Sequence, residues 1–169
     1  MVAAFASLAQ TVDPQKVIRA IEGDFNRDGR IDRAVLMEDA DSGGATFVIF
    51  VGNGGGKFRS VKLPLSFYGA PELLDLRVTK AGSLEISEGH FGGGRYAWER
   101  TLTLSYRKGQ FLISGFTSSS FDRLDPESSY ASCNVNLLTG KGKVRGEKIS
   151  VKAGGIPMDQ WSGPPAECQ

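Results

Sequence analysis

A strict two-residue alternation over residues 96–107 is the feature that most limits what this chain can fold into. Tyr96, Trp98, Arg100 and the even-numbered residues after them fall on one face, and mostly polar residues fall on the other. A period of two is the period of a β-strand. A Lys-Gly turn and a second apolar run over residues 110–116 follow directly. This stretch therefore predicts a β-hairpin.

Several other segments carry the same signal. Residues 84–88, 130–138 and 143–151 are predicted as strands, and the chain's 22 glycines supply turns between them. A length of 169 residues favours one domain. We predict a mainly β domain over residues 13–152, with about eight to ten antiparallel strands in a meander that is sandwich-like or barrel-like. Residues 153–169, rich in Gly and Pro, are predicted to form an irregular tail.

The N-terminal segment allows two interpretations. Residues 1–12 are mostly small and apolar, which matches either the end of a signal peptide without its basic start or a disordered start. Asp13 and Pro14 then precede Val17, Ile18 and Ile21. That order predicts one short N-terminal helix, with Asp as its N-cap and Pro at its first position.

Charge and hydropathy exclude some partners. Twenty basic residues against nineteen acidic ones leave a net charge of +1, which argues against nucleic acid or an anionic membrane as the main partner. No apolar run approaches the roughly eighteen residues of a membrane span. The expected partner is a protein or a surface glycan, and its identity stays open.

Residues 24–32 carry the one specific chemical signal. Oxygen ligands recur there at positions one, three, five, seven and nine, and Gly29 at position six suits a sharp turn. The predicted ligands of one structural Ca²⁺ are the side chains of Asp24, Asn26, Asp28 and Asp32 and the backbone carbonyl of Arg30. The alternative is a plain polar turn. An EF-hand is excluded because position twelve is Val35, inside a strand-like run, where that motif needs Glu.

The loop resembles a known repeat. Residues 23–36 resemble the calcium-loop half of an FG-GAP (VCBS-like) repeat, and residues 47–58, with a Gly-Asn-Gly turn before Phe58, resemble its second half. Such repeats form β-propeller blades in integrin α-chains and many bacterial surface proteins, where the calcium is structural. A propeller needs at least about four blades. Because no second such loop occurs downstream, the resemblance implies one unit over residues 22–60 and not a full propeller.

A second resemblance and two cysteines point to export. Residues 88–106 are similar to a pattern in small exported bacterial proteins without assigned activity, in which a calcium loop precedes a Gly-Gly turn and a Trp-x-Arg strand. In an exported protein Cys133 and Cys168 are expected to pair, and in a cytosolic one they would be free thiols. The expected location is periplasmic or secreted.

Candidate sites outside the loop are few. His90, the single histidine, has no partner that its spacing identifies, and Asp122 and Asp125 are interpreted as solvated turn residues. Arg100 lies on an otherwise apolar strand face, which predicts an ion pair or stacking on Trp98 or Tyr96, with an anion or partner contact as the alternative.

These patterns favour one hypothesis over two others. No catalytic constellation is found, so no catalytic residue and no cofactor besides Ca²⁺ is predicted. The first hypothesis is a non-enzymatic, exported, calcium-binding β domain that acts as a binding module. The alternatives are an inhibitor or immunity protein for a secreted enzyme, and a hydrolase that uses His90 near the metal loop.

Overall fold

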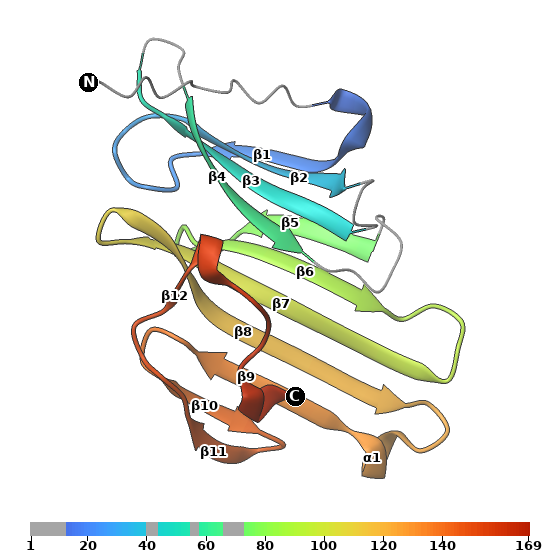
Figure 1. Cartoon of the computed structure of the whole chain (residues 1–169). Coiled ribbons are helices and arrows are strands. Elements are labelled where there is room, and N and C mark those ends of the chain that lie inside the picture. The colour runs from blue at the N-terminus through green and yellow to red at the C-terminus, as the bar shows by residue number, and fades with distance from the viewer. Residues whose placement is uncertain (1–12, 40–43, 55–57, 66–72) are drawn as a thin grey trace, which may run out of the picture.

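The chain folds into two open antiparallel sheets that share one core (Figure 1). The computed structural model describes residues 13–39, 44–54, 58–65 and 73–169. The predicted signal-peptide remnant or disordered start, residues 1–12, lies outside these ranges. The mainly β prediction is confirmed.

The smaller sheet has four strands in chain order. They are β1 (Val17–Gly23), β2 (Asp32–Asp39), β3 (Gly44–Gly52) and β4 (Phe58–Leu65). Residues 24–31 join β1 to β2, and the pairing sets Ala20 opposite Val35. The strand predicted to follow the loop at residues 24–32 is therefore present, as β2.

The larger sheet continues the meander in the order β11-β10-β9-β8-β7-β6-β5. Its strands are β5 (Leu74–Val78), β6 (Leu84–His90), β7 (Tyr96–Arg107), β8 (Gln110–Asp122), β9 (Ala131–Asn136), β10 (Lys141–Val144) and β11 (Glu147–Ser150), with β12 (Ile156–Pro157) paired to β8. The hairpin predicted at residues 96–116 is confirmed. Lys108 and Gly109 both have positive φ, 50° and 83°. Such a turn twists in the same sense as the strands that it joins.

Two expectations about the elements are wrong. The short N-terminal helix is a 3₁₀ turn (Pro14–Lys16), after which Val17 begins a strand. Asp13 does cap that turn, accepting from the Gln15 N–H at 3.0 Å. The helical spacing fails because β-branched residues suit a strand and because β2 supplies the hydrogen bonds. The one α-helix among the described residues is α1 (Pro126–Ser129).

The strand number also exceeds the expected eight to ten. The described ranges contain twelve strands. The segment predicted at residues 143–151 divides into β10 and β11 around Arg145 and Gly146, both at positive φ. Strand β12 is only two residues long and carries no pattern of its own. Short strands of this kind are defined by their pairing and leave little trace in sequence.

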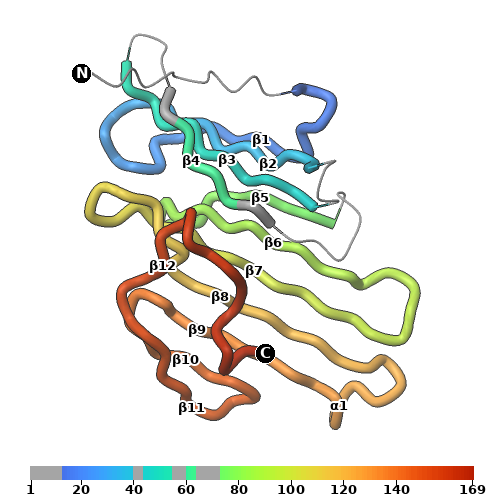
Figure 2. The backbone as a smooth tube through the Cα atoms, viewed as in Figure 1, coloured from blue at the N-terminus to red at the C-terminus, as the bar shows by residue number. Residues whose placement is uncertain are grey.

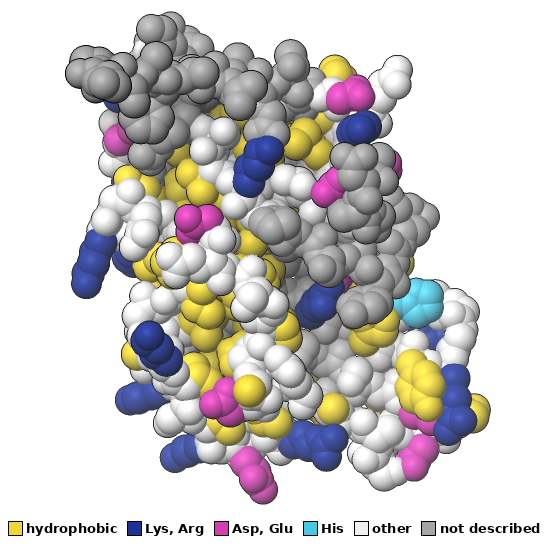
Figure 3. Space-filling view, viewed as in Figure 1, with side chains coloured by type: hydrophobic (Ala, Val, Ile, Leu, Met, Phe, Trp, Pro, Cys, Tyr) yellow, Lys and Arg dark blue, Asp and Glu magenta, His cyan; other side chains and the backbone are white. Residues whose placement is uncertain are grey.

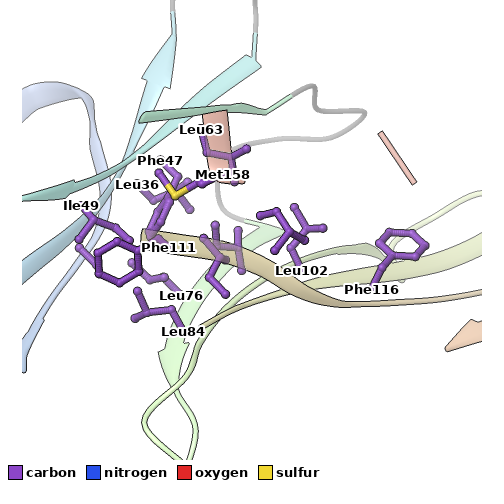
Figure 4. Close-up of a cluster of buried hydrophobic side chains, with 14 of the residues drawn as sticks. Leu36, Phe47, Ile49, Leu63, Leu76, Leu84, Leu102, Phe111, Phe116 and Met158 are labelled. Atoms are coloured by element: carbon purple, nitrogen blue, oxygen red, sulfur yellow. The ribbon is translucent and has the colours of Figure 1, made fainter. Parts of the chain in front are cut away.

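The core lies between the two sheets (Figure 4). Buried side chains from the smaller sheet meet those of the larger sheet there: Leu36, Phe47, Ile49 and Leu63 on one side, and Leu76, Leu84, Phe111 and Ile113 on the other. Met158, in the 3₁₀ turn Met158–Gln160, joins them from the tail. Burial of such apolar area is the dominant favourable term in folding.

The tail, predicted to be irregular, contains the short strand β12 and two 3₁₀ turns, and it packs against the larger sheet. Its path crosses in front of β8 and β9 (Figure 2). The Trp161 ring lies 6.2 Å from the Phe116 ring, and Cys168 forms a disulfide with Cys133 on β9. The predicted cysteine pairing is confirmed, with a Cα–Cα distance of 5.5 Å. The disulfide is consistent with an oxidising compartment.

Candidate functional site

Side-chain oxygens in the loop between β1 and β2 accept hydrogen bonds from the loop's own backbone N–H groups. The two carboxylate oxygens of Asp24 accept hydrogen bonds from the N–H groups of Asp28 and Gly29, at 3.0 and 2.9 Å. The side-chain oxygen of Asn26 accepts from the same Asp28 N–H, at 3.0 Å. Because one N–H group meets both acceptors, the oxygens of Asp24 and Asn26 converge. Gly29 turns the chain with φ of +81°.

Asp28 continues this arrangement toward the end of the loop. Its Oδ1 accepts from the Arg30 N–H at 2.9 Å, and its Oδ2 accepts from the Asn26 amide at 3.0 Å. The loop thus brings together three of the five predicted ligands: Asp24, Asn26 and Asp28. Their oxygen-only chemistry fits a hard cation such as Ca²⁺.

Asp32 takes a different position from the other aspartates. It is fully buried, and its two oxygens accept hydrogen bonds from the Phe25 and Gly52 N–H groups, each at 2.9 Å. Asp32 thereby ties the start of the loop to the end of β3. Across the described ranges, no three His, Cys, Asp or Glu side chains are grouped as a metal site. The ligand roles of all five residues, including the Arg30 carbonyl, stay predictions.

Residues that the spacing argument missed hold the loop in place. Phe25 is a buried core residue within an otherwise polar loop. A Cβ atom on Gly23 would lie 2.7 Å from the Phe25 ring, and one on Gly52 would lie 2.4 Å from the Ile31 carbonyl oxygen. Both glycines are therefore required for close approach. In the sequence, the one signal for this anchoring role was Phe25 itself, an apolar residue at position two of a polar loop.

The loop also reaches the larger sheet. The Arg27 guanidinium donates to the carbonyl of Ala81, in the turn between β5 and β6, at 2.9 Å. A small polar cleft opens beside this contact, between the loop and Arg107 at the end of β7. Its free volume of about 20 Å³ suits one water molecule and no larger ligand.

A chain of serine hydroxyls leads from that cleft into the sheet. Ser114 donates to the Thr103 carbonyl at 3.1 Å, and its Oγ lies 2.8 Å from that of Ser105. Ser83 follows at 2.9 Å from Ser105. Each hydroxyl carries one proton, so Ser105 must donate to Ser114 and Ser83 to Ser105. The chain is thus a satisfied polar network without a free nucleophile.

His90 lies far from the loop. Strand β6 begins just after the turn that Arg27 touches and ends at His90, so about 20 Å of strand separates the two. The His90 Nε2 atom lies 3.0 Å from the carbonyl oxygen of Gly93, in the glycine-rich turn. The structure does not bring His90 and the predicted ligands together.

The expectation for Arg100 is confirmed. Arg100 forms an ion pair with Glu88, its partner across β6 and β7. Its guanidinium carbon also lies 5.8 Å from the centre of the Trp98 ring, within reach of a cation–π interaction.

A second group of the same kind lies nearby, and the sequence did not predict it. Arg95 binds Asp122 through Nε and Nη2, at 2.7 and 2.6 Å from Oδ2, and its guanidinium carbon lies 5.5 Å from the Tyr96 ring centre. The interpretation of Asp122 as a solvated turn residue is wrong, because it is buried. The Arg95 hydrogen bond, together with one from the Leu124 N–H, lowers the pKa of Asp122.

The described ranges contain no helix with the length and apolar character needed to cross a membrane.

Comparison of the chain with family models, with curated proteins and with solved structures found no match, so the sites above are interpreted from their chemistry alone.

Proposed function

We propose that this chain is a non-enzymatic, calcium-binding β domain that acts as a binding module outside the cytoplasm. The convergence of the Asp24 and Asn26 oxygens, with Asp28 beside them, is the observation that carries the metal assignment. Three polar side chains gathered by a short loop suit a hard cation, which prefers oxygen ligands and tolerates irregular geometry. The single FG-GAP-like unit at residues 22–60 belongs to the same proposal.

The metal would act as a structural staple. Asp24, Asn26 and Asp28 would hold the ion, and the remaining lone pairs of Asp32 leave room for that carboxylate to contribute. The loop is anchored on β3 through Asp32 and on the β5–β6 turn through Arg27. An ion that orders the loop would therefore stiffen the contact between the two sheets.

The disulfide between Cys133 and Cys168 supports the proposed location. Structural disulfides persist in oxidising compartments and are rare in the cytosol. We therefore propose that the protein acts in the periplasm or the extracellular medium, with a protein or surface glycan as its partner.

The other two hypotheses have less support. A hydrolase that uses His90 would need this residue near the metal loop, and about 20 Å of strand β6 lies between them. An inhibitor or immunity protein would also use a binding surface, and co-purification of a secreted enzyme would distinguish it from a general binding module. The binding module is thus the hypothesis that requires the fewest features beyond the described contacts.

Calcium titration tests the proposal. Isothermal titration calorimetry should detect one site, and saturation at a hundredfold excess over Kd should raise the free energy of unfolding by about 2.7 kcal/mol. The double variant Asp24→Asn, Asp28→Asn removes two charges and keeps one acceptor oxygen at each position. The loop is exposed, so water can accept from the N–H group that loses its carboxylate oxygen, and the variant should fold and lose calcium binding.

Asp159→Asn is a matched control, since Asp159 is exposed and lies in the tail. It should bind calcium like the unchanged protein. No heat of binding at millimolar calcium, or unfolding that is identical in calcium and in chelator, would show that the loop is only a polar turn.

A further inference from the structure

Two carboxylate–arginine–aromatic groups stand side by side at one end of the larger sheet. We call them the two stacks: Asp122–Arg95–Tyr96 and Glu88–Arg100–Trp98. In each, a carboxylate binds an arginine whose guanidinium lies against an aromatic ring. The arrangement is repeated although its members come from three strands and a turn.

The pairing of strands puts the stacks on one face. Tyr96 lies opposite Asp122, and Arg100 lies opposite Glu88. Directly paired residues share a sheet face, and so do residues two apart on one strand. Trp98 therefore lies between Tyr96 and Arg100 on that face, and the Cα positions of Tyr96 and Trp98 are about 6.6 Å apart along β7.

Both acids are buried, and the arginines and rings are more accessible. In the first stack exposure rises from 9% at Asp122 through 58% at Arg95 to 61% at Tyr96. In the second stack Glu88 is 9% exposed, Arg100 is 29% exposed and Trp98 is half-buried. The buried acids therefore fix the arginines, which in turn support the rings. Figure 3 shows hydrophobic, basic and acidic side chains intermixed at this end of the sheet, near the histidine.

Hydrogen bonds between neighbouring turns make this surface rigid. The Arg123 N–H donates to the Arg95 carbonyl at 2.9 Å, and the Arg123 guanidinium donates to the Phe91 carbonyl at 2.6 Å. Asp122 also accepts from the Leu124 N–H at 3.0 Å. A surface that is ordered before binding loses less conformational entropy when a ligand arrives.

The chemistry of the stacks selects a class of ligand. Each arginine charge is balanced by its own buried carboxylate, so the two stacks by themselves carry no net charge to attract an anion or a cation. What it offers is N–H donors fixed beside aromatic faces, and the negative face of an aromatic ring attracts polarised C–H groups. A sugar ring presents C–H groups on its face and hydroxyls at its rim, so it can use both features at once.

We propose that the two stacks form a binding surface for a neutral oligosaccharide, with adjacent sugar units lying on Tyr96 and Trp98. This inference rests on the proposed function as a binding module and names its ligand class. Both rings can be contacted by one chain because they follow each other along the same strand face. A protein partner is the rival occupant, since exposed Tyr and Arg also occur at protein interfaces.

Calorimetric titration with a panel of soluble oligosaccharides tests the proposal. The probes are cellohexaose, xylohexaose, maltohexaose, mannohexaose and chitohexaose, with polygalacturonate as the anionic comparison, all in calcium-containing buffer. At least one neutral chain should bind. Tyr96→Ala should weaken that binding by about tenfold, and Tyr96→Phe should restore it, because the ring face makes the contact.

Tyr130→Ala is the matched control, since Tyr130 is a similarly exposed tyrosine outside both stacks, and it should bind like the unchanged protein. The proposal is overturned if folded protein binds no neutral chain, if Tyr96→Ala binds as well as Tyr96→Phe, or if polygalacturonate binds most tightly. A Tyr96-dependent complex with a protein that no sugar displaces would also overturn it. Calcium uptake without sugar binding overturns this inference alone, whereas sugar binding without calcium uptake supports it and overturns only the metal role.

Discussion

Replacement of Asp32 by alanine should be among the most damaging single changes in this protein. The carboxylate is fully buried and accepts backbone N–H groups from Phe25 and Gly52, 2.9 Å from each. Hydrogen bonds to a charged group contribute about 1.5–3 kcal/mol each. Two of them give an expected loss of about 3–6 kcal/mol, and both N–H groups would be left buried without an acceptor. A domain of this kind has a total stability of only about 5–15 kcal/mol.

Asp32→Asn keeps the volume of the side chain but changes its charge and its hydrogen-bonding groups. The amide has nearly the same size, but only its oxygen can accept, and its NH₂ group would face one of the two N–H donors. We expect this variant to lose about half as much as Asp32→Ala. Urea denaturation in chelator measures both variants without any contribution from a metal.

Repeating the denaturation in calcium tests whether Asp32 is also a ligand. If it is, calcium should stabilise the unchanged protein more than the Asp32→Asn variant. Asp24→Ala, at an exposed position, serves as the comparison and should cost less in chelator. A loss below about 1 kcal/mol for Asp32→Ala in chelator would refute the assignment of Asp32 as a buried acceptor of two backbone hydrogen bonds.

Three further outcomes follow from other contacts. Because Arg95 lowers the pKa of Asp122, this carboxylate stabilises the fold above its ordinary pKa of about 3.9 and ceases to do so as pH falls through its lowered value, so Asp122→Asn should flatten the acid side of a stability–pH curve. Gly52→Ala should destabilise by about 1–3 kcal/mol in denaturation, whereas Gly93→Ala, whose Cβ would meet nothing within 4 Å, should stay within about 0.5 kcal/mol. Replacing Cys133 by serine should cost about 3–4 kcal/mol, and a reducing agent should lower the melting temperature of the unchanged protein but not of this variant.

The longest strands and their turns were predictable because the signal is local. The hairpin of β7 and β8 is specified by alternation and by a Lys-Gly turn, neither of which depends on distant parts of the chain. The N-terminal helix failed for the opposite reason. Val17, Ile18 and Ile21 fit both a helical and an extended pattern, and the choice was made by pairing with β2.

In the candidate sites, too, the local features were predictable from sequence and the contacts between distant residues were not. The ligand pattern of the loop is local, so spacing alone could propose Asp24, Asn26 and Asp28 together. The role of Asp32 depends on Gly52, which lies twenty residues away on another strand. The Arg95–Asp122 pair spans twenty-seven residues, and a polar loop position gave no sign that Asp122 would be buried.

The sequence by itself determined that this chain is a β domain, that residues 24–32 form a tight oxygen-rich loop, and that two cysteines were available to pair. Those properties come from the period of side chains, the freedom of glycine and the chemistry of single residues. Only the tertiary structure decided that the strands form two sheets, that Asp32 faces inward, and that the two stacks share one surface. These outcomes depend on register between distant strands, where a shift of one residue would move each side chain to the opposite face of the sheet.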